Sequence, residues 1–180
     1  MEILKLNKLD QDVILDWGHN GYKTNGVYEV TKTMHPGSFQ FMLQKMEKEY
    51  LKTWTVNAED ITRFNEIISA RHSYRALDKG KIIGFILAVN RKWNNTLYIE
   101  NLLVSEFHRG QGAGHLLINQ IKQDARVSGF RLIELETQNT NVPAHEFYLK
   151  QGFEITGMNL KLYVEDVENE IALYMTYDLR

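Results

Sequence analysis

A glycine-rich segment with one arginine is the part of this sequence best suited to chemistry. Residues 109–114 read Arg-Gly-Gln-Gly-Ala-Gly, between an apolar stretch at 97–104 and a helical pattern. Alternate glycines let a backbone approach a ligand closely and adopt positive φ. A helix start behind them offers unpaired N–H groups and a partial positive charge. With the charge of Arg109 beside it, the segment predicts a site for an anion such as a pyrophosphate.

Two other kinds of phosphate loop do not fit this segment. A P-loop continues with Lys and Ser/Thr after its last glycine, whereas His115-Leu116 follows here. A dinucleotide fingerprint needs G-x-G-x-x-G directly after a strand, whereas this segment reads G-x-G-x-G behind an arginine and several spacer residues. A surface loop without a ligand is the remaining alternative.

The elements that must position the segment follow from the hydrophobic pattern after Ser73. Apolar and β-branched runs predict strands, and apolar residues every three or four positions predict helices. Strands are expected at 74–77 and 82–89 as a hairpin, at 97–104, at 132–137, within 153–164 and at 171–179; helices are expected from 113 to near 129 and from 141 to 152. The run at 97–104 is almost wholly apolar, which predicts burial on both faces.

The first part of the chain predicts a short strand at 1–6 and then mostly helix between residues 10 and 70. The spacing of Phe39, Leu43, Met46 and Tyr50 after Pro36-Gly37 is typical of an amphipathic helix. A second helix is indicated by apolar residues between Ile61 and Ile68. The order of elements predicts an α/β domain with a mixed sheet.

Composition excludes several functions for the 180 residues. There are 21 Lys+Arg and 23 Asp+Glu, a formal net charge of −2, so a nucleic-acid partner is not expected. The absence of Cys excludes disulfides and thiol nucleophiles, and the six His show no metal-ligand spacing. No apolar run of about 18 residues occurs, and the N-terminus is not a secretory signal, so we expect a cytoplasmic protein without a membrane partner.

The sequence resembles the GCN5-related N-acetyltransferases (GNAT family). Their acetyl-CoA motif, R/Q-x-x-G-x-G/A, fits Arg109, Gly112 and Gly114, and a second feature fits Asn141, Phe147-Tyr148 and Gly152-Phe153. Short stretches resemble the streptothricin acetyltransferase branch; they are 92–94, 99–101, 109–112, 135–139 and 171–174. The resemblance implies an α/β fold with a mixed, largely antiparallel sheet flanked by helices. It also implies one domain, 1–180, with a variable, mostly helical acceptor-side part at 1–70 and an acetyl-CoA-binding core at 73–180.

The resemblance also implies roles for individual residues. Acetyl-CoA would be the co-substrate, with no metal, and would be bound by Leu102, Leu103, Val104, Arg109, Gly110, Gln111, Gly112, Ala113, Gly114 and Asn141. A backbone N–H at Leu103 would polarise the thioester carbonyl. Tyr148 would donate the proton to the leaving sulfur; a core aromatic is the alternative. Asn141 would contact the pantetheine arm, cap a helix, or do both.

Glu100 is the candidate base, because a carboxylate inside an apolar strand is costly unless it is partnered or used. Desolvation there would make it a better base, acting directly or through water. The alternatives are a carboxylate on an open strand face, paired with a cation of the chain, or one that only binds a cationic substrate.

Several further residues are candidates for contact with a substrate. Glu134, Glu136 and the acidic run at 165–170 are candidates to meet an ammonium group, although a solvated acidic loop is the simpler interpretation of that run. Tryptophans are usually core residues, with Trp54 or Trp17 at the acceptor cleft as the alternative. His108 is a candidate for the rim of the pyrophosphate site.

The function expected from the resemblance is acetyl transfer from acetyl-CoA to a primary amine of a small polycationic molecule of streptothricin type, hence antibiotic resistance. The alternative is acetylation of a protein N-terminus or lysine. From another class, a catalytically silent CoA-binding module would be expected to lack Glu100 or Tyr148, and both are present. The sequence leaves open whether the chain forms a homodimer.

Overall fold

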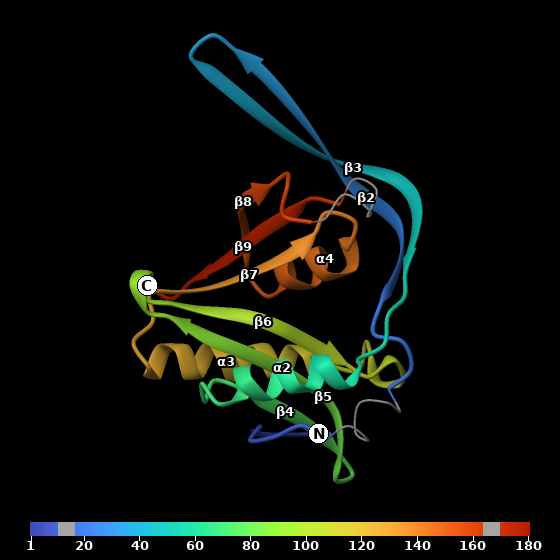
Figure 1. The fold of residues 1–180 in the computed structure, drawn as a ribbon, viewed down its shortest axis with the longest axis vertical. Coiled ribbons are helices and arrows are strands. Elements are labelled where there is room, and N and C mark those ends of the chain that lie inside the picture. Colours follow the sequence, from blue (N-terminus) through green and yellow to red (C-terminus); the bar gives the residue numbers. More distant parts are fainter. Residues whose placement is uncertain (11–16, 164–169) are drawn as a thin grey trace.

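A seven-stranded sheet forms the centre of the molecule in the computed structural model, which describes residues 1–10, 17–163 and 170–180 (Figure 1). Its strands are β1 (Glu2–Lys5), β4 (Tyr74–Asp78), β5 (Lys81–Arg91), β6 (Thr96–Val104), β7 (Leu132–Gln138), β8 (Glu154–Asn159) and β9 (Ala172–Asp178). The other elements are β2 (Tyr22–His35), β3 (Ser38–Lys52), α2 (Ala58–Ile68), α3 (Ala113–Val127), α4 (Val142–Lys150) and two short 3₁₀ turns, η1 (Lys92–Asn94) and η2 (Glu106–His108).

The sheet order is β1-β4-β5-β6-β7-β9-β8, and only the β6–β7 pair is parallel among the strands described. Helices flank both faces. On β5, Phe85 and Leu87 pack with α2, whereas Ile86 and Ala88 pack in the cluster that contains α3. This alternation follows from the two-residue period of a strand. The predicted mixed, largely antiparallel sheet with flanking helices is therefore confirmed, as are the elements expected after Ser73.

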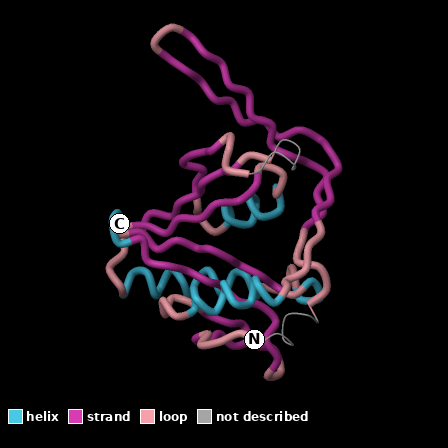
Figure 2. The backbone as a smooth tube through the Cα atoms, viewed as in Figure 1, coloured by secondary structure: helices cyan, strands magenta, loops and turns pink. Residues whose placement is uncertain are grey.

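The prediction of a mostly helical region between residues 10 and 70 is wrong. Its only helix among the described residues is α2, which confirms the helix expected near Ile61–Ile68. The helix expected around Phe39 to Tyr50 is instead strand β3, paired antiparallel with β2 in a long hairpin. Figure 2 shows this hairpin running beside the sheet and projecting beyond it.

Turn chemistry and tertiary contacts explain the error. His35 pairs with Ser38, so Pro36 and Gly37 are the two loop residues, and Gly37 has φ +77°. Proline followed by a glycine at positive φ is the residue pattern of a type II turn. The spacing of three and four in β3 was accidental, because good helix formers adopt the strand when a partner strand and a docking surface are present.

The middle of β2 docks on the loop before α4. The Tyr28 N–H donates to the Asn139 carbonyl (3.0 Å), and the Asn139 amide donates to the Tyr28 carbonyl (2.7 Å). The Tyr28 ring meets the buried His145 ring edge-on, with centroids 5.3 Å apart. The hairpin is therefore tied to the sheet far from its own position in the sequence.

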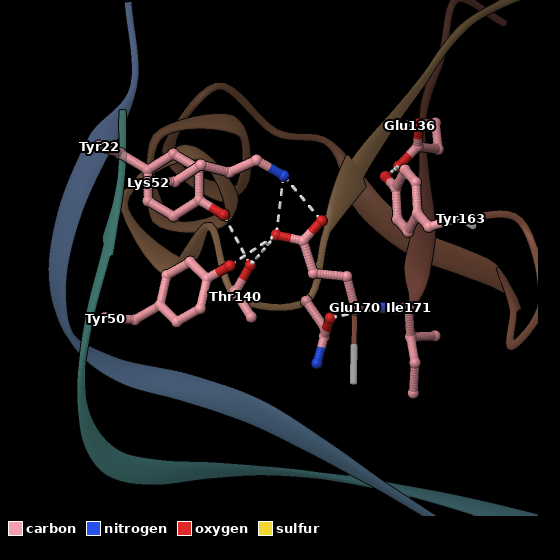
Figure 3. Close-up of polar contacts among 9 residues, drawn as sticks. Tyr22, Tyr50, Lys52, Glu136, Thr140, Tyr163, Glu170 and Ile171 are labelled. Atoms are coloured by element: carbon pink, nitrogen blue, oxygen red, sulfur yellow. Dashed lines mark hydrogen bonds and ion pairs between the residues drawn. The ribbon is translucent and has the colours of Figure 1, made fainter. Parts of the chain in front are cut away.

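A buried ion pair forms the second attachment (Figure 3). Lys52 Nζ lies 2.8 and 2.7 Å from the two carboxylate oxygens of Glu170, whose side chain is 1% exposed. The Tyr50 hydroxyl donates to the same carboxylate at 2.9 Å, and the Thr140 hydroxyl lies 3.3 Å from it. Tyr22, at the start of β2, hydrogen-bonds Thr140 at 2.6 Å. These groups join both hairpin strands to the segments before α4 and β9.

Strands β6 and β7 are paired only at one end. Their register runs from Thr96 opposite Leu132 to Ile99 opposite Leu135 and stops there, and the two strands diverge beyond it (Figure 1). A bulge coincides with this point: β5 pairs with Ile99 and Asn101 of β6 and leaves Glu100 between them unpaired. Bulges bend a strand and re-aim its side chains. The sheet therefore opens where the candidate site was expected.

No helix in the described part of the chain is both long enough and apolar enough to cross a membrane.

We expect Glu170→Gln to destabilise the fold by about 1.5–3 kcal/mol, because Lys52 and Tyr50 lose a buried charged acceptor. Urea or guanidinium unfolding would measure this change. The matched control is Glu146→Gln, which removes the exposed ion pair between Lys45 of the same hairpin and α4. Exposed pairs contribute about 1 kcal/mol at most. Equal losses in the two variants would contradict the importance of burial.

Candidate functional site

A cleft lies where β6 and β7 diverge, and it has two adjoining halves. The half beside the glycine-rich segment, here the loop half, has a volume of about 570 Å³. The half beside β7, here the acidic half, contains Glu100 and Glu136 and has a volume of about 260 Å³. The residues that line both are Asn20, Tyr22, Leu102, Leu103, Asn141, Ala144 and Tyr148.

The loop half has the backbone geometry expected of an anion cradle. Gly110 has φ +74° and Gly112, which is the N-cap of α3, has φ +93°. A Cβ at either position would have no atom within 4 Å, so both face open space beside the helix start. Ala113 and Gly114 also line this half, but a Cβ on Gly114 would lie 3.2 Å from the Phe147 ring. Gly114 therefore allows α3 to approach α4.

Arg109 and Gln111 have structural contacts of their own. The Arg109 guanidinium donates to the carbonyls of Val104 (3.2 Å), Gly21 (2.8 Å) and His19 (3.0 Å). Arg109 lines the loop half and, in addition, ties the segment before β2 to the end of β6. Gln111 does not line either half, and its side-chain amide donates to the Phe107 carbonyl at 3.0 Å.

The edge of β6 that faces the loop half has no strand partner among the described residues beyond Ile99. Leu102, Leu103 and Val104, to which the resemblance assigns acetyl-CoA binding, line this half. An unpaired strand edge presents alternating N–H and C=O groups, to which an extended ligand can bind as a further strand does.

Tyr148 of α4 lies on the wall shared by the two halves. Its ring is 8% exposed and packs against Phe147 and Phe153, with centroids 5.2 and 5.5 Å away. The hydroxyl has no hydrogen-bond partner in the described part of the chain, and burial raises the pKa of Tyr148 above its usual value. The core-aromatic and the proton-donor interpretations are thus compatible. Asn141 accepts a hydrogen bond from the Ala144 N–H at 3.2 Å, so its capping role is confirmed.

Glu100 lies in the acidic half, but its surroundings differ from the expectation. The bulge turns its side chain outward, and the side chain is exposed rather than desolvated. It has no ion-pair partner among the described residues, which leaves its carboxylate available to a ligand. Burial therefore gives no reason to regard Glu100 as a strengthened base.

Glu136 and Glu134 have different environments although both lie on β7. Glu136 lines the acidic half and accepts a hydrogen bond from the Tyr163 hydroxyl, and partial burial raises the pKa of Glu136. Glu134 lies outside the cleft, where Arg91 Nη1 binds it at 2.9 Å. Only Glu136 of the two is placed to meet a ligand in this cleft.

Some of the remaining candidate residues line the cleft and others do not. Trp54 lines the acidic half and His108 the loop half, whereas Trp17 is buried against Phe85 in the core. Of the acidic run, Glu170 is the buried partner of Lys52, so the expectation of a solvated side chain is wrong for it. Glu165, Asp166 and Glu168 lie outside the described residues. Within the described ranges, no three His, Asp or Glu gather as a metal site.

Sequence reasoning missed the wall that the hairpin contributes. Tyr22 and Lys52 line the cleft from the start of β2 and the end of β3, and Asn20 lines it from the segment just before β2. The signals available were the turn-forming pair Asn20-Gly21 and the β-branched and aromatic residues that follow it, which favour a strand. Nothing local indicates that this strand returns to the cleft.

Comparison with known proteins identifies relatives of the chain. It is 40% identical over 103 residues to a streptothricin acetyltransferase from Escherichia coli, a match that covers 56% of this chain and 59% of that protein. The match thus spans less than two thirds of the relative.

Two solved structures share nearly the whole fold. Nourseothricin acetyltransferase superposes with a TM-score of 0.78 at 25% identity, over 99% of this chain and 98% of its own. A candidate streptothricin acetyltransferase of Bacillus anthracis, in complex with acetyl coenzyme A, has a TM-score of 0.72 at 28% identity, over 98% and 99% of the two chains. A family model, described as the acetyltransferase (GNAT) family, matches residues 39–153. Because that match covers more than half of the sequence, the chain belongs to the GNAT acetyltransferase family.

Proposed function

We propose that this protein transfers an acetyl group from acetyl-CoA to a primary amine of a small polycationic molecule of streptothricin type. The observation that carries the proposal is the position of Tyr148 on the wall shared by an anion-cradling half and an acidic half of one cleft. The similar proteins named above, a streptothricin and a nourseothricin acetyltransferase, support the same acceptor class.

The loop half suits acetyl-CoA by its shape and chemistry. The open faces of Gly110 and Gly112 and the start of α3 would hold the pyrophosphate through backbone N–H groups. The free edge of β6 would hold the amide-containing pantetheine arm as an added strand, which directs the thioester toward Leu103 and Tyr148. Holding two reactants in register contributes several kcal/mol to catalysis.

The reaction requires proton movements that the residues can supply. The amine nitrogen forms a bond to the thioester carbon, the carbon–sulfur bond breaks, and the sulfur takes a proton. The Tyr148 hydroxyl carries its proton at neutral pH, as tyrosines ordinarily do, and burial raises its pKa further, so it would be available as the proton donor. The amine must lose a proton, which Glu100, Glu136 or water would accept.

The acidic half suits an acceptor with several amino groups. Glu100 and Glu136 present carboxylates there, and the charge of Lys52 on the same wall is compensated by Glu170. The described lining therefore attracts cations, and Trp54 offers an aromatic face for their apolar parts. A polycation can place one amino group at Tyr148 while its other ammonium groups meet the carboxylates.

The proposed acceptor is tested by comparing kcat/KM for streptothricin, spermidine, an aminoglycoside and a peptide with a free N-terminus. We expect streptothricin to be preferred. A tenfold preference for the peptide would replace the proposal by protein acetylation, and no turnover of any amine would remove it.

Glu136→Gln should raise the KM for streptothricin roughly tenfold, about 1.4 kcal/mol, by removing one half-buried carboxylate from the acceptor wall. The KM of the unaltered protein should fall as pH rises through the raised pKa of Glu136, because the carboxylate binds a cation only when ionised. Steady-state kinetics across the weakly acidic range would show both effects. Glu134→Gln, on the same strand but outside the cleft, is the control, and a similar KM change in it would contradict the assignment.

Gly112→Val should weaken acetyl-CoA binding by at least about tenfold, because the side chain would fill the cradle beside the start of α3. Calorimetric titration with acetyl-CoA measures the change. Gly129→Val is a matched control: Gly129 also has positive φ, +74°, and open space around its Cβ, but it follows the far end of α3. Equal affinity in the two variants would place the pyrophosphate elsewhere.

Tyr148→Phe should lower kcat by about 10²-fold with little change in acetyl-CoA affinity, since it removes only the proton donor. In the unaltered protein kcat should not decline on the alkaline side up to about pH 10, the usual tyrosine pKa, because burial keeps the phenol protonated beyond it. Tyr177→Phe, whose hydroxyl meets Arg126 outside the cleft, should keep full kcat. Full kcat in Tyr148→Phe would leave that ring only a packing role.

A further inference from the structure

The side chain of Asn20 is buried in the cleft wall and has no hydrogen-bond partner in the part of the chain that the structure describes. The residue is 7% exposed, and neither its side-chain nitrogen nor its side-chain oxygen has a hydrogen-bond partner among residues 1–10, 17–163 and 170–180. It lines both the loop half and the acidic half. Its amide therefore lies at the junction where the two reactants of the proposed reaction would meet.

The backbone around Asn20 is held in place from several sides. Its own N–H donates to the Trp54 carbonyl at 2.7 Å. Arg109 binds the carbonyls of both neighbours, His19 and Gly21, and His19 Nε2 lies 3.1 Å from Glu106. An unpaired amide on so well anchored a segment cannot easily turn away to find other partners. Its position is therefore preorganised.

Burial of an unpaired amide is unfavourable for folding, because its hydrogen bonds to water are lost without replacement. Other polar side chains of this wall are paired: Tyr22 with Thr140, and Lys52 with Glu170. Native structures keep unsatisfied buried groups mainly where a ligand or water completes them. Asn20 thus resembles a binding group more than a structural one.

We propose that the Asn20 amide binds both reactants during acetyl transfer: its nitrogen donates to the acetyl carbonyl oxygen, and its oxygen accepts from an N–H of the attacking amine. This inference rests on the proposed function. The amide has a donor end for the acetyl carbonyl oxygen and an acceptor end for the amine N–H. Binding both at once would hold the amine nitrogen next to the acetyl carbon.

Asn20 neither donates nor accepts a transferred proton in this reaction. As the carbon–nitrogen bond forms, the carbonyl oxygen gains negative charge, and the amide N–H stabilises it. The oxygen loses this negative charge when the carbonyl double bond re-forms and the carbon–sulfur bond breaks. The sulfur then takes the proton of Tyr148. The amine proton leaves to a carboxylate or water, and Asn20 ends unchanged.

Asn20→Ala tests the inference by separating stability from catalysis. We expect kcat/KM for the acceptor to fall by about 10²-fold, the effect of removing one oxyanion donor. The Tm of the free protein should stay the same or rise, because an unpaired buried amide has been removed. Calorimetry should show that the variant loses any preference for acetyl-CoA over CoA, since only the acetyl group would meet the amide.

Asn20→Asp and Asn25→Ala complete the experiment. The aspartate keeps the acceptor atoms but has no N–H, so kcat should fall as in the alanine variant while the KM for the amine does not rise. Asn25 is exposed on β2 outside both halves, and its variant should keep full activity.

Unchanged kcat/KM in Asn20→Ala would overturn the inference, as would a lower Tm with proportionate loss of acetyl-CoA and CoA binding, which would indicate a structural role. These results are distinct from failure of the proposed function, in which the unaltered protein would acetylate none of the amines.

Discussion

Strand β6 has, among the described residues, an unpaired edge beyond Ile99, and the cleft exists because of that edge. Backbone N–H and C=O groups need partners, and β6 has them from β7 only as far as Ile99. Beyond that point the sheet opens, the bulge at Glu100 marks the opening, and the edge is left for a ligand. Every proposed binding role in the cleft follows from that divergence, because a fully paired sheet would have no site between these strands.

The hairpin of β2 and β3 forms one wall of the cleft, and the diverging strands of the sheet form another. The hairpin and the segment just before it contribute Asn20, Tyr22 and Lys52 to the cleft wall, and the buried pair of Lys52 with Glu170 attaches the hairpin to segments before α4 and β9. Arg109 holds the beginning of the hairpin to the end of β6. Residues that line the cleft therefore also attach the hairpin, so the contacts that stabilise the fold position the acceptor wall as well.

Charge divides the cleft into two chemically different halves. The glycine-rich segment and the start of α3 offer N–H groups to an anion, while Glu100 and Glu136 offer carboxylates to a cation. Tyr148 lies between them, packed against aromatic neighbours, and its burial raises the pKa of its hydroxyl above the usual value. One anionic and one cationic reactant would therefore be oriented in opposite directions, with their reacting ends at the tyrosine.

Local structure could be predicted from short-range patterns in the sequence. Strand alternation and helical spacing were sufficient for the elements of residues 73–180, and the glycine segment at 109–114 indicated part of the loop half. The family resemblance, rather than local pattern, pointed to Leu102–Val104, Asn141 and Tyr148. The hairpin and the environments of several cleft residues depend on contacts between distant segments. The strand β3 resembled a helix, because its partner strand and the docking of Tyr28 are not visible locally. The exposure of Glu100 and the burial of Asn20 likewise depend on a bulge and on contacts between distant segments, which no local spacing encodes.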